Sequence, residues 1–276
     1  MLFRVAFVLA SMTALLVHPV EAVSQDMLRS VDLNGPDMST SEMTRAEVEA
    51  LLKAAPQDAA GQRSADLQGR RLSHLDLSGL DFSAGNLRLV KLNRTNLKRA
   101  RFDRAILNQA WLIDADLTEA SLVKASLLGA QMQRARLGGA DLTGSRITAD
   151  LSGASLVGAT LAGADLSADM RNQSMGLMRG VLKSADLTNA NLSGANLARA
   201  DLQFAKLEKA NLTDCNLSHA DLAGADLSNA NLAGADFTGT ELASALLPSA
   251  ATLEKARNLD KALNLNLARR PREGGQ

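Results

Sequence analysis

The chemically reactive side chains in this sequence are few and widely separated. Beyond the first 22 residues the chain has two histidines, His74 and His219, and a single cysteine, Cys215. A metal or acid–base site needs several such groups at close spacing, and no zinc, phosphate-loop or nucleophile motif occurs. Carboxylates are numerous, but most occupy one fixed place in a short repeat. We therefore expect no catalytic, cofactor-binding or metal residues, and no enzyme activity.

The element that must position every side chain is a repeat of five residues. The central position is apolar at all 17 sites from Leu67 to Ile147 and at all 14 sites from Leu182 to Leu247. Alanine usually precedes the centre by two residues, and Asp or Asn precedes it by one. A period of five fits neither an α-helix nor a simple strand. Residues two apart share one side of an extended segment, so Ala and Leu would point inward while the other three residues turn the chain.

The unit Ala-(Asp/Asn)-Leu-x-x, as in Ala65-Asp66-Leu67 and Ala185-Asp186-Leu187, resembles the pentapeptide-repeat family. That resemblance implies an all-β fold, a right-handed quadrilateral β-helix (β-solenoid), here over residues 62–250. Four units would make one coil of about 20 residues, and about nine coils would stack at about 4.8 Å. The close-packed interior leaves no ligand cavity, so no small-molecule substrate is expected. Function must lie on the outer faces, the ends or an irregular segment.

This geometry predicts surface or core positions, without a chemical role, for the reactive groups. Both histidines follow a repeat centre by two residues and should face solvent about seven coils apart, while Cys215 takes an inward alanine position. Polar residues spaced by 20 should form columns along the rod. The acidic column is Asp201, Asp221 and Glu241, and the asparagine column is Asn191, Asn211 and Asn231.

The repeat changes phase once and recovers. Ile147 and Leu151 are four residues apart, and Leu166 and Leu177 are eleven apart, which restores the phase. We interpret residues 167–180 as a bulge, corner loop or irregular coil. The segment is a candidate contact loop because it carries adaptable methionines; binding of a soft metal such as Cu(I) is the alternative. Its candidate contact residues are Met170, Arg171, Met175, Met178 and Arg179.

Both ends of a stacked rod need caps, because unpaired backbone there would promote aggregation. Thr44 and Glu47 have the spacing of a capping box, which predicts a helix over residues 45–54 inside an otherwise disordered segment, 23–61. At the other end, five apolar residues from Leu253 to Leu267 fit one helical face, so we expect a helix over about 253–268, within a C-terminal unit of 251–268, with Thr252 as N-cap. Residues 269–276 should be a disordered tail.

The first 22 residues read as a secretory signal peptide. A short basic start is followed by an apolar run from Val5 to Val17, and Val20-Glu21-Ala22 supplies small residues for cleavage after Ala22. We expect a periplasmic or secreted protein. An uncleaved membrane anchor is the alternative, although the run is short for a span.

Net charge is zero, with 30 basic and 30 acidic residues, but the charge is unevenly distributed. Residues 63–136 hold 13 basic and 7 acidic residues, whereas 137–250 hold 7 and 12. The basic excess gathers in about one coil, on successive sides, and we call these residues the basic belt. It could meet an acidic protein or an anionic envelope surface. The belt consists of Arg88, Lys91, Arg94, Lys98, Arg99, Arg101 and Arg104.

These features bear on three classes of function: a scaffold, a DNA mimic and an enzyme. The sequence favours a non-catalytic scaffold that binds a protein or cell-envelope partner through its outer faces. The alternative is mimicry of DNA toward a type II topoisomerase, a role that the resemblance brings with it and that needs an acidic cytoplasmic rod. A neutral chain with an export signal disfavours that role and direct nucleic-acid binding. Association of copies through the ends of the dipolar rod is a further alternative.

Overall fold

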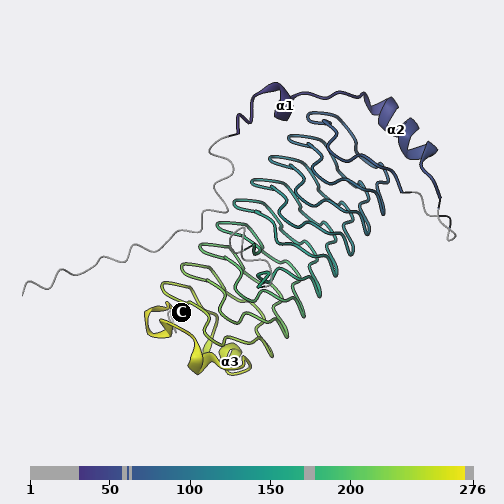
Figure 1. Cartoon of the computed structure of the whole chain (residues 1–276). Helices are drawn as coiled ribbons and strands as arrows, with labels where there is room; N and C mark the ends of the chain where they lie inside the picture. The colour runs from purple at the N-terminus through teal and green to yellow at the C-terminus, as the bar shows by residue number, and fades with distance from the viewer. Residues whose placement is uncertain (1–30, 58–60, 62–63, 171–177, 271–276) are drawn as a thin grey trace, which may run out of the picture.

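The structure is a computed structural model that describes residues 31–57, 61, 64–170 and 178–270. Over the regular part, each residue before a repeat centre forms a parallel β-bridge with its counterpart one turn of the coil later, as Asp66 does with Asn86. These bridges fall into four ladders, and we number the outer faces after them. Face 1 passes through Asn86, face 2 through Lys91, face 3 through Asn96 and face 4 through Arg101. Figure 1 shows the resulting stack of coils.

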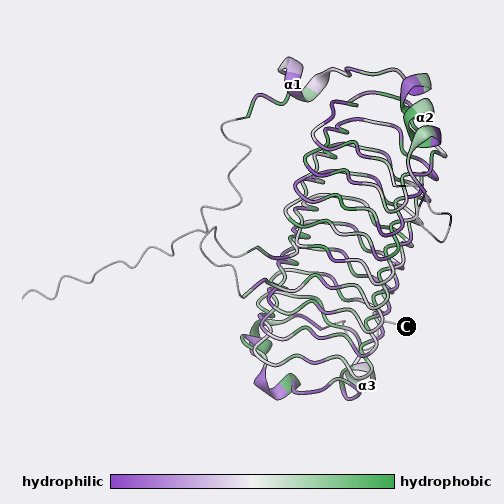
Figure 2. Cartoon of the chain, turned by 45° about the vertical axis from the view of Figure 1, so that its right-hand side comes forward, coloured by the Kyte–Doolittle hydropathy of each residue, from purple (hydrophilic) through white to green (hydrophobic). Residues whose placement is uncertain are grey.

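The interior is built from the residues that the five-residue period predicts. Every repeat centre from Leu67 to Leu166 and from Leu182 to Leu247 is buried, and from Phe102 onward a small buried residue lies two positions earlier. Near the N-terminal end the layers are bulkier: Val90 is buried, and the rings of Phe82 and Phe102 stack with centroids 5.0 Å apart and planes 8° apart. Figure 2 shows hydrophobic and hydrophilic residues alternating along each coil. The expected total of about nine coils stays a prediction.

Two polar positions turn the chain at each corner. The residue before the centre accepts a hydrogen bond from the backbone N–H two residues later, as the Asp76 carboxylate does from Ser78 at 3.0 Å. The residue two after the centre has a left-handed backbone, for example Arg99 at φ 55°. Asp and Asn form such local turns readily. The repeated Asp and Asn residues are therefore explained by turn formation alone.

The phase change is confirmed in the register. Four successive bridges span 19 residues instead of 20, beginning with Gln131 and Asp150, and the next four span 31, beginning with Asp150 and Val181. The chain still pairs with the coil at Ala168, whose N–H donates to the Ala198 carbonyl at 3.1 Å, and it pairs again at Gly180. The Gly180 N–H donates to the Leu166 carbonyl at 2.9 Å, and a Cβ on Gly180 would lie 2.9 Å from that same oxygen. This close approach explains the glycine, and the segment is a corner loop that leaves the coils in register.

The N-terminal cap contains the expected helix and one unexpected element. Helix α2 spans Arg45–Ala54, with the Thr44 and Glu47 capping box formed in both directions. A second helix, α1, spans Pro36–Ser39 and buries Met38, so disorder is the wrong prediction for this part of residues 23–61. The Asn93 amide donates to the Met38 carbonyl at 3.2 Å, which ties α1 to face 2. Residues 23–30 and the signal-peptide segment lie outside the described residues.

The prediction of a C-terminal helix over 253–268 is wrong. Only α3, Ala250–Leu253, is α-helical, and Ser249 rather than Thr252 is its N-cap. The following residues continue the coil in steps of six, with bridges from Arg257, Leu263 and Arg269 to the preceding turn. The 3-10 turns η3, Leu259–Lys261, and η4, Leu265–Leu267, lie between these bridges. Backbone pairing to an existing ladder satisfies more polar groups than an isolated lid helix would, and a six-residue period mimics a helical stripe.

No helix among the described residues is both long and apolar enough to cross a membrane. Figure 1 places α1 and α2 at one end of the coil and α3 with the C-terminal segment at the other. The faces between these ends are therefore the main surfaces on which a partner could dock.

Candidate interaction surfaces

The basic belt surrounds the rod instead of forming a flat patch. Arg88 follows a centre on face 1, Lys91 lies in the ladder of face 2, Lys98 follows a centre on face 3, and Arg101 lies in the ladder of face 4. Arg94, Arg99 and Arg104 occupy corners, and all but the half-buried Lys91 are exposed. A flat partner can therefore contact only part of the belt at one time.

Several belt charges are matched locally by carboxylates. Lys98 lies 3.4 Å from Asp116, and Arg101 lies 3.0 Å from Asp103 and 3.9 Å from Asp81. Burial acts to raise the pKa of Asp116, but hydrogen bonds from Thr118 and the neighbouring cations hold it below the usual value. Among the described carboxylates none lies within 4 Å of Arg88, Lys91 or Arg99, and Arg88 donates only to the neutral Asn86 side chain. These three cations carry the belt's least compensated charge.

Both ends of the corner loop are held on the rod. The Ala168 N–H donates to the Ala198 carbonyl at 3.1 Å, and Arg179 forms an ion pair with Asp201 at 3.1 Å. The Asp169 N–H donates to the Met178 carbonyl at 2.8 Å and joins the two ends to each other. Met178 packs beside Gly129, where an added Cβ would lie 3.2 Å from the methionine methyl carbon. Met170 is 49% exposed and offers an apolar contact. Arg171 and Met175 lie outside the described residues.

The predicted polar columns are present, and their side chains form hydrogen bonds within the column or to neighbouring side chains. Asn211 donates to Asn191 at 3.1 Å, while Asn231 donates to the Thr213 hydroxyl at 3.0 Å. In the acidic column, Asp221 accepts from Gln203 and Glu241 accepts from Asn264. Within the described chain no group of three or more His, Cys, Asp or Glu residues could hold a metal ion. The columns therefore stabilise the stack and show no built ligand site.

The reactive side chains are placed as expected. Both histidines are exposed at corners with left-handed backbone. Cys215 is fully buried, and its thiol donates to the Leu192 carbonyl at 2.8 Å. Burial raises the pKa of this thiol to about 12. A thiolate nucleophile needs a lowered pKa and access to solvent, so Cys215 is a core residue.

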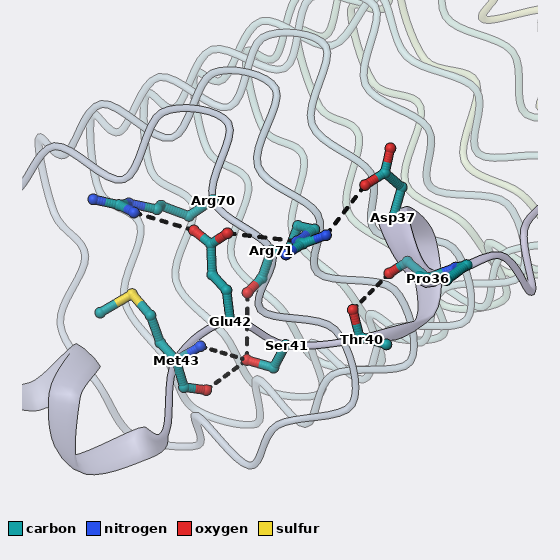
Figure 3. A network of polar contacts seen from close by, with 8 residues as sticks. All are labelled: Pro36, Asp37, Thr40, Ser41, Glu42, Met43, Arg70 and Arg71. Carbon is teal, nitrogen blue, oxygen red and sulfur yellow. Dashed lines mark hydrogen bonds and ion pairs between the residues drawn. The ribbon is translucent and has the colours of Figure 1, made fainter.

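An ion-pair network that holds the N-terminal segment on the first coil was not predicted from the sequence (Figure 3). Glu42 accepts from Arg70 at 3.2 Å and lies 3.4 Å from Arg71, which also pairs with Asp37 at 3.2 Å. Ser41 forms an antiparallel bridge with Leu72. The segment from Asp32 to Glu42 has three acidic residues and no basic one, which does not by itself identify partners 28 to 34 residues apart.

A groove between α2 and the first coils was also missed. Its volume is about 560 Å³, within the range of peptide and ligand sites. Face 4 supplies one wall and α2 the other, and two members of the basic belt, Arg101 and Arg104, reach it. The groove is lined by Glu49, Leu52, Lys53, Gln57, Gly61, Gly79, Leu80, Asp81, Ser83, Arg101 and Arg104.

The coil and its sequence repeat define a known class of repeat protein. The profile of the family described as Pentapeptide repeats matches eight copies, which together cover residues 71–168 and 181–247. The chain belongs to the pentapeptide-repeat family. The parallel bridge ladders make its coil a stacked β-helix, and the family match indicates no catalytic family. No curated protein sequence matches the chain.

Among solved structures, HetL of the cyanobacterium Nostoc sp. strain PCC 7120, described as involved in heterocyst differentiation regulation, is 31% identical. The match covers 83% of this chain and 95% of HetL, with a TM-score of 0.35. A trypsin-treated form of QnrB1, described as a plasmid-mediated fluoroquinolone resistance protein, is 19% identical over 76% of this chain and 91% of QnrB1, with a TM-score of 0.45. Rfr23 of Cyanothece 51142 is 29% identical over 44% of this chain and 60% of its own, with a TM-score of 0.19.

Proposed function

We propose that this protein is an exported, non-catalytic scaffold that binds a protein partner, or a cell-envelope surface, through the outside of its coil. One observation supports this above all: the coil interior is filled with buried aliphatic side chains, so binding groups are confined to the exterior and the ends. A rod held by backbone pairing in every turn presents those groups without a cost of ordering them on binding.

The basic belt and the corner loop are the proposed contact surfaces. Lys91 and Arg99 supply uncompensated charge that would speed encounter with an acidic partner. Met170 supplies an exposed, adaptable apolar side chain next to the rod. Contact through the loop and contact through the belt are separable, because they lie at different levels along the coil.

Capture from the periplasm with the mature protein as bait tests this proposal. Matched baits would be the intact protein, a charge-reversed Lys91→Glu/Arg99→Glu variant, and a variant lacking residues 168–178. We expect one partner at stoichiometric level with the intact bait and less with at least one variant. Equal recovery by all three baits would remove both surfaces, and an intact Met1 in a cytosolic protein would remove export.

DNA mimicry toward a type II topoisomerase is the second candidate. The acidic column on face 2, which runs from Asp201 to Glu241 along the C-terminal half, is the observation that favours it. A supercoiling assay separates the two candidates: inhibition of gyrase at micromolar protein would support mimicry. Unchanged supercoiling at that concentration would leave the scaffold as the sole proposal.

A further inference from the structure

The first coil keeps an open backbone edge on face 4. In the next coil, the Arg101 N–H donates to the Leu80 carbonyl at 2.9 Å, and its carbonyl accepts from Phe82 at 2.7 Å. The Asp103 carbonyl likewise accepts from Ala84 at 2.8 Å. The equivalent groups of the first coil are the N–H and C=O of Asp81 and the C=O of Ser83. None of these three groups has a partner among the described residues.

On two other faces of the same coil, the N-terminal segment pairs with part of the edge. On face 2, Ser41 forms an antiparallel bridge with Leu72, and the Glu42 N–H donates to the Arg71 carbonyl at 2.9 Å. On face 3, the Arg45 guanidinium donates to the carbonyls of Asp76 and Ser78 at 2.9 and 3.1 Å. The chain thus shows that an extended segment can pair with this end of the coil. Among the described residues faces 1 and 4 stay open, and only the edge of face 4 lies in the groove.

The open edge lies in the groove beside α2. Asp81 and Ser83 both line the groove, and the Ser83 side chain is 8% exposed with a hydroxyl that has no hydrogen-bond partner. A buried polar group without a partner costs free energy, which a bound donor or acceptor would recover. Helix α2 forms the facing wall, so a strand added at this edge would also be covered by side chains.

The walls of the groove specify the side chains of such a strand. Leu52 and Leu80 are half-buried aliphatic residues that an aliphatic side chain would cover. Of the charged residues that line the groove, Glu49 is paired with Arg45 at 2.7 Å, and Arg101 is paired with Asp103 at 3.0 Å. Exposed Lys53 stands at the helix side, where an acidic side chain would complement it.

We propose that this groove binds a short extended segment of the partner protein, which adds as a strand to the edge at Asp81 and Ser83. The segment carries an aliphatic residue for Leu52 and Leu80 and an acidic residue for Lys53. This inference rests on the proposed function as a protein-binding scaffold. Strand addition to an exposed edge uses main-chain hydrogen bonds for affinity and pockets for specificity.

A library of hexapeptides blocked at both ends tests the inference with the full mature protein. We expect enrichment of peptides that combine aliphatic and acidic residues. For an enriched peptide, Lys53→Glu should weaken binding about fivefold or more, a change of about 1 kcal/mol. The control Lys124→Glu, an exposed cation outside both the groove and the basic belt, should leave the affinity within about twofold. No enrichment, or equal weakening by both variants, would overturn the proposal.

Hydrogen exchange distinguishes strand addition from binding elsewhere. The bound peptide should slow exchange of the Asp81 amide and leave the Arg101 amide, which is already paired, unchanged. Peptide binding without protection of Asp81 would contradict the inference. Capture of the same whole partner by wild type and Lys53→Glu would reject the groove and keep the scaffold, whereas absence of any partner would reject the scaffold itself.

Discussion

Leu127 shows how strongly a single repeat centre determines the fold. Its side chain is fully buried in the middle of the coil. Leu127→Asp would place a carboxylate in a dry layer without a cation, which costs several kcal/mol. We expect loss of cooperative folding, measured as loss of the thermal unfolding transition by circular dichroism.

Lys124→Asp is the matched control for this change. Lys124 is exposed at a corner with φ 57°, a conformation that Asp tolerates well. It is a cleaner control than Lys98, which pairs with Asp116. Its free energy of unfolding should change by about 0.5 kcal/mol or less. Similar melting of the two variants would contradict the inside and outside assignment.

Cys215 should be chemically silent until the coil opens. Because burial raises the pKa of its thiol to about 12, almost no thiolate exists at pH 8, and the sulfur is inaccessible. We expect labelling by a thiol reagent to be negligible in native protein and complete in denaturant. Rapid labelling of the native protein at one thiol per chain would show that this layer opens locally or that the thiol is exposed.

For single residues, the sequence predicted burial wherever a position follows the five-residue period. Leu127 and Cys215 occupy positions fixed by spacing alone, so their burial followed directly. The ion pair between Glu42 and Arg70 was not predictable, because it depends on the direction in which the N-terminal segment crosses the first coil. The groove is missed for the same reason: Leu52 and Leu80 meet only after α2 has docked.

Among the elements, α2 depends on its N-terminal cap. The Thr44 hydroxyl accepts from the Glu47 N–H, and the Glu47 carboxylate accepts from the Thr44 N–H at 2.7 Å. Thr44→Ala should destabilise the helix by about 1 kcal/mol and increase amide exchange across Arg45–Ala54 about fivefold. Thr44→Ser should retain most of the protection. Equal exchange in the Ala variant and wild type would show that tertiary contacts alone hold the helix.

The last coil layer should be weakened by acid. Hydrogen bonds from Asn258, and then from Thr238, lower the pKa of the Asp236 carboxylate to about 2. A lowered folded-state pKa stabilises the layer above the unfolded value near 3.8, and this contribution is lost as pH falls toward 2. We expect the protection of backbone amides in residues 257–269, measured by hydrogen exchange relative to the intrinsic rate, to fall between pH 4 and pH 2.

Asp236→Asn tests the origin of that dependence. The neutral amide cannot titrate, so amide protection in this variant should not show the acid-dependent fall. The exposed control Asp260→Asn should keep that fall. The same pH dependence in wild type and Asp236→Asn would assign the effect to other carboxylates. This layer also explains the wrong helix prediction, because Leu253, Leu259 and Leu263 fit a helical face as well as a coil with six-residue steps.

For the whole molecule, the coil depends on the phase of the five-residue repeat and does not need an unbroken series of repeats. Leu67 and Leu247 belong to one stack although the register shifts by one residue near Asp150 and a loop of eleven extra residues intervenes. The repeat predicted this recovery because only a return to phase keeps leucine inside. The number of coils and the surroundings of the two ends were harder to predict from the sequence, since the end layers depart from the repeat.

Excision of the corner loop tests phase as the determinant of the fold. Removing residues 168–178 joins Leu166-Ser167 to Arg179-Gly180-Val181-Leu182, which restores five-residue spacing and places Arg179 at the corner position. Shortening a loop also lowers the entropic cost of closing it. We expect the variant to keep its circular-dichroism spectrum, with a melting temperature within about 4 °C of wild type, equivalent to about 1 kcal/mol.

Removing one residue more, 168–179, is the decisive comparison. Leu166 and Leu182 are then four residues apart, as Ile147 and Leu151 are, but the residue for the left-handed corner position is gone. Aspartates and asparagines would replace leucines on the axis unless the chain forms a second short corner of that kind. We expect this variant to melt at least about 10 °C lower or to lose its cooperative transition, since buried polar groups there have no partners. Equal stability of the two excisions would mean that the loop region relaxes freely, and that the two halves of the rod fold as independent stacks.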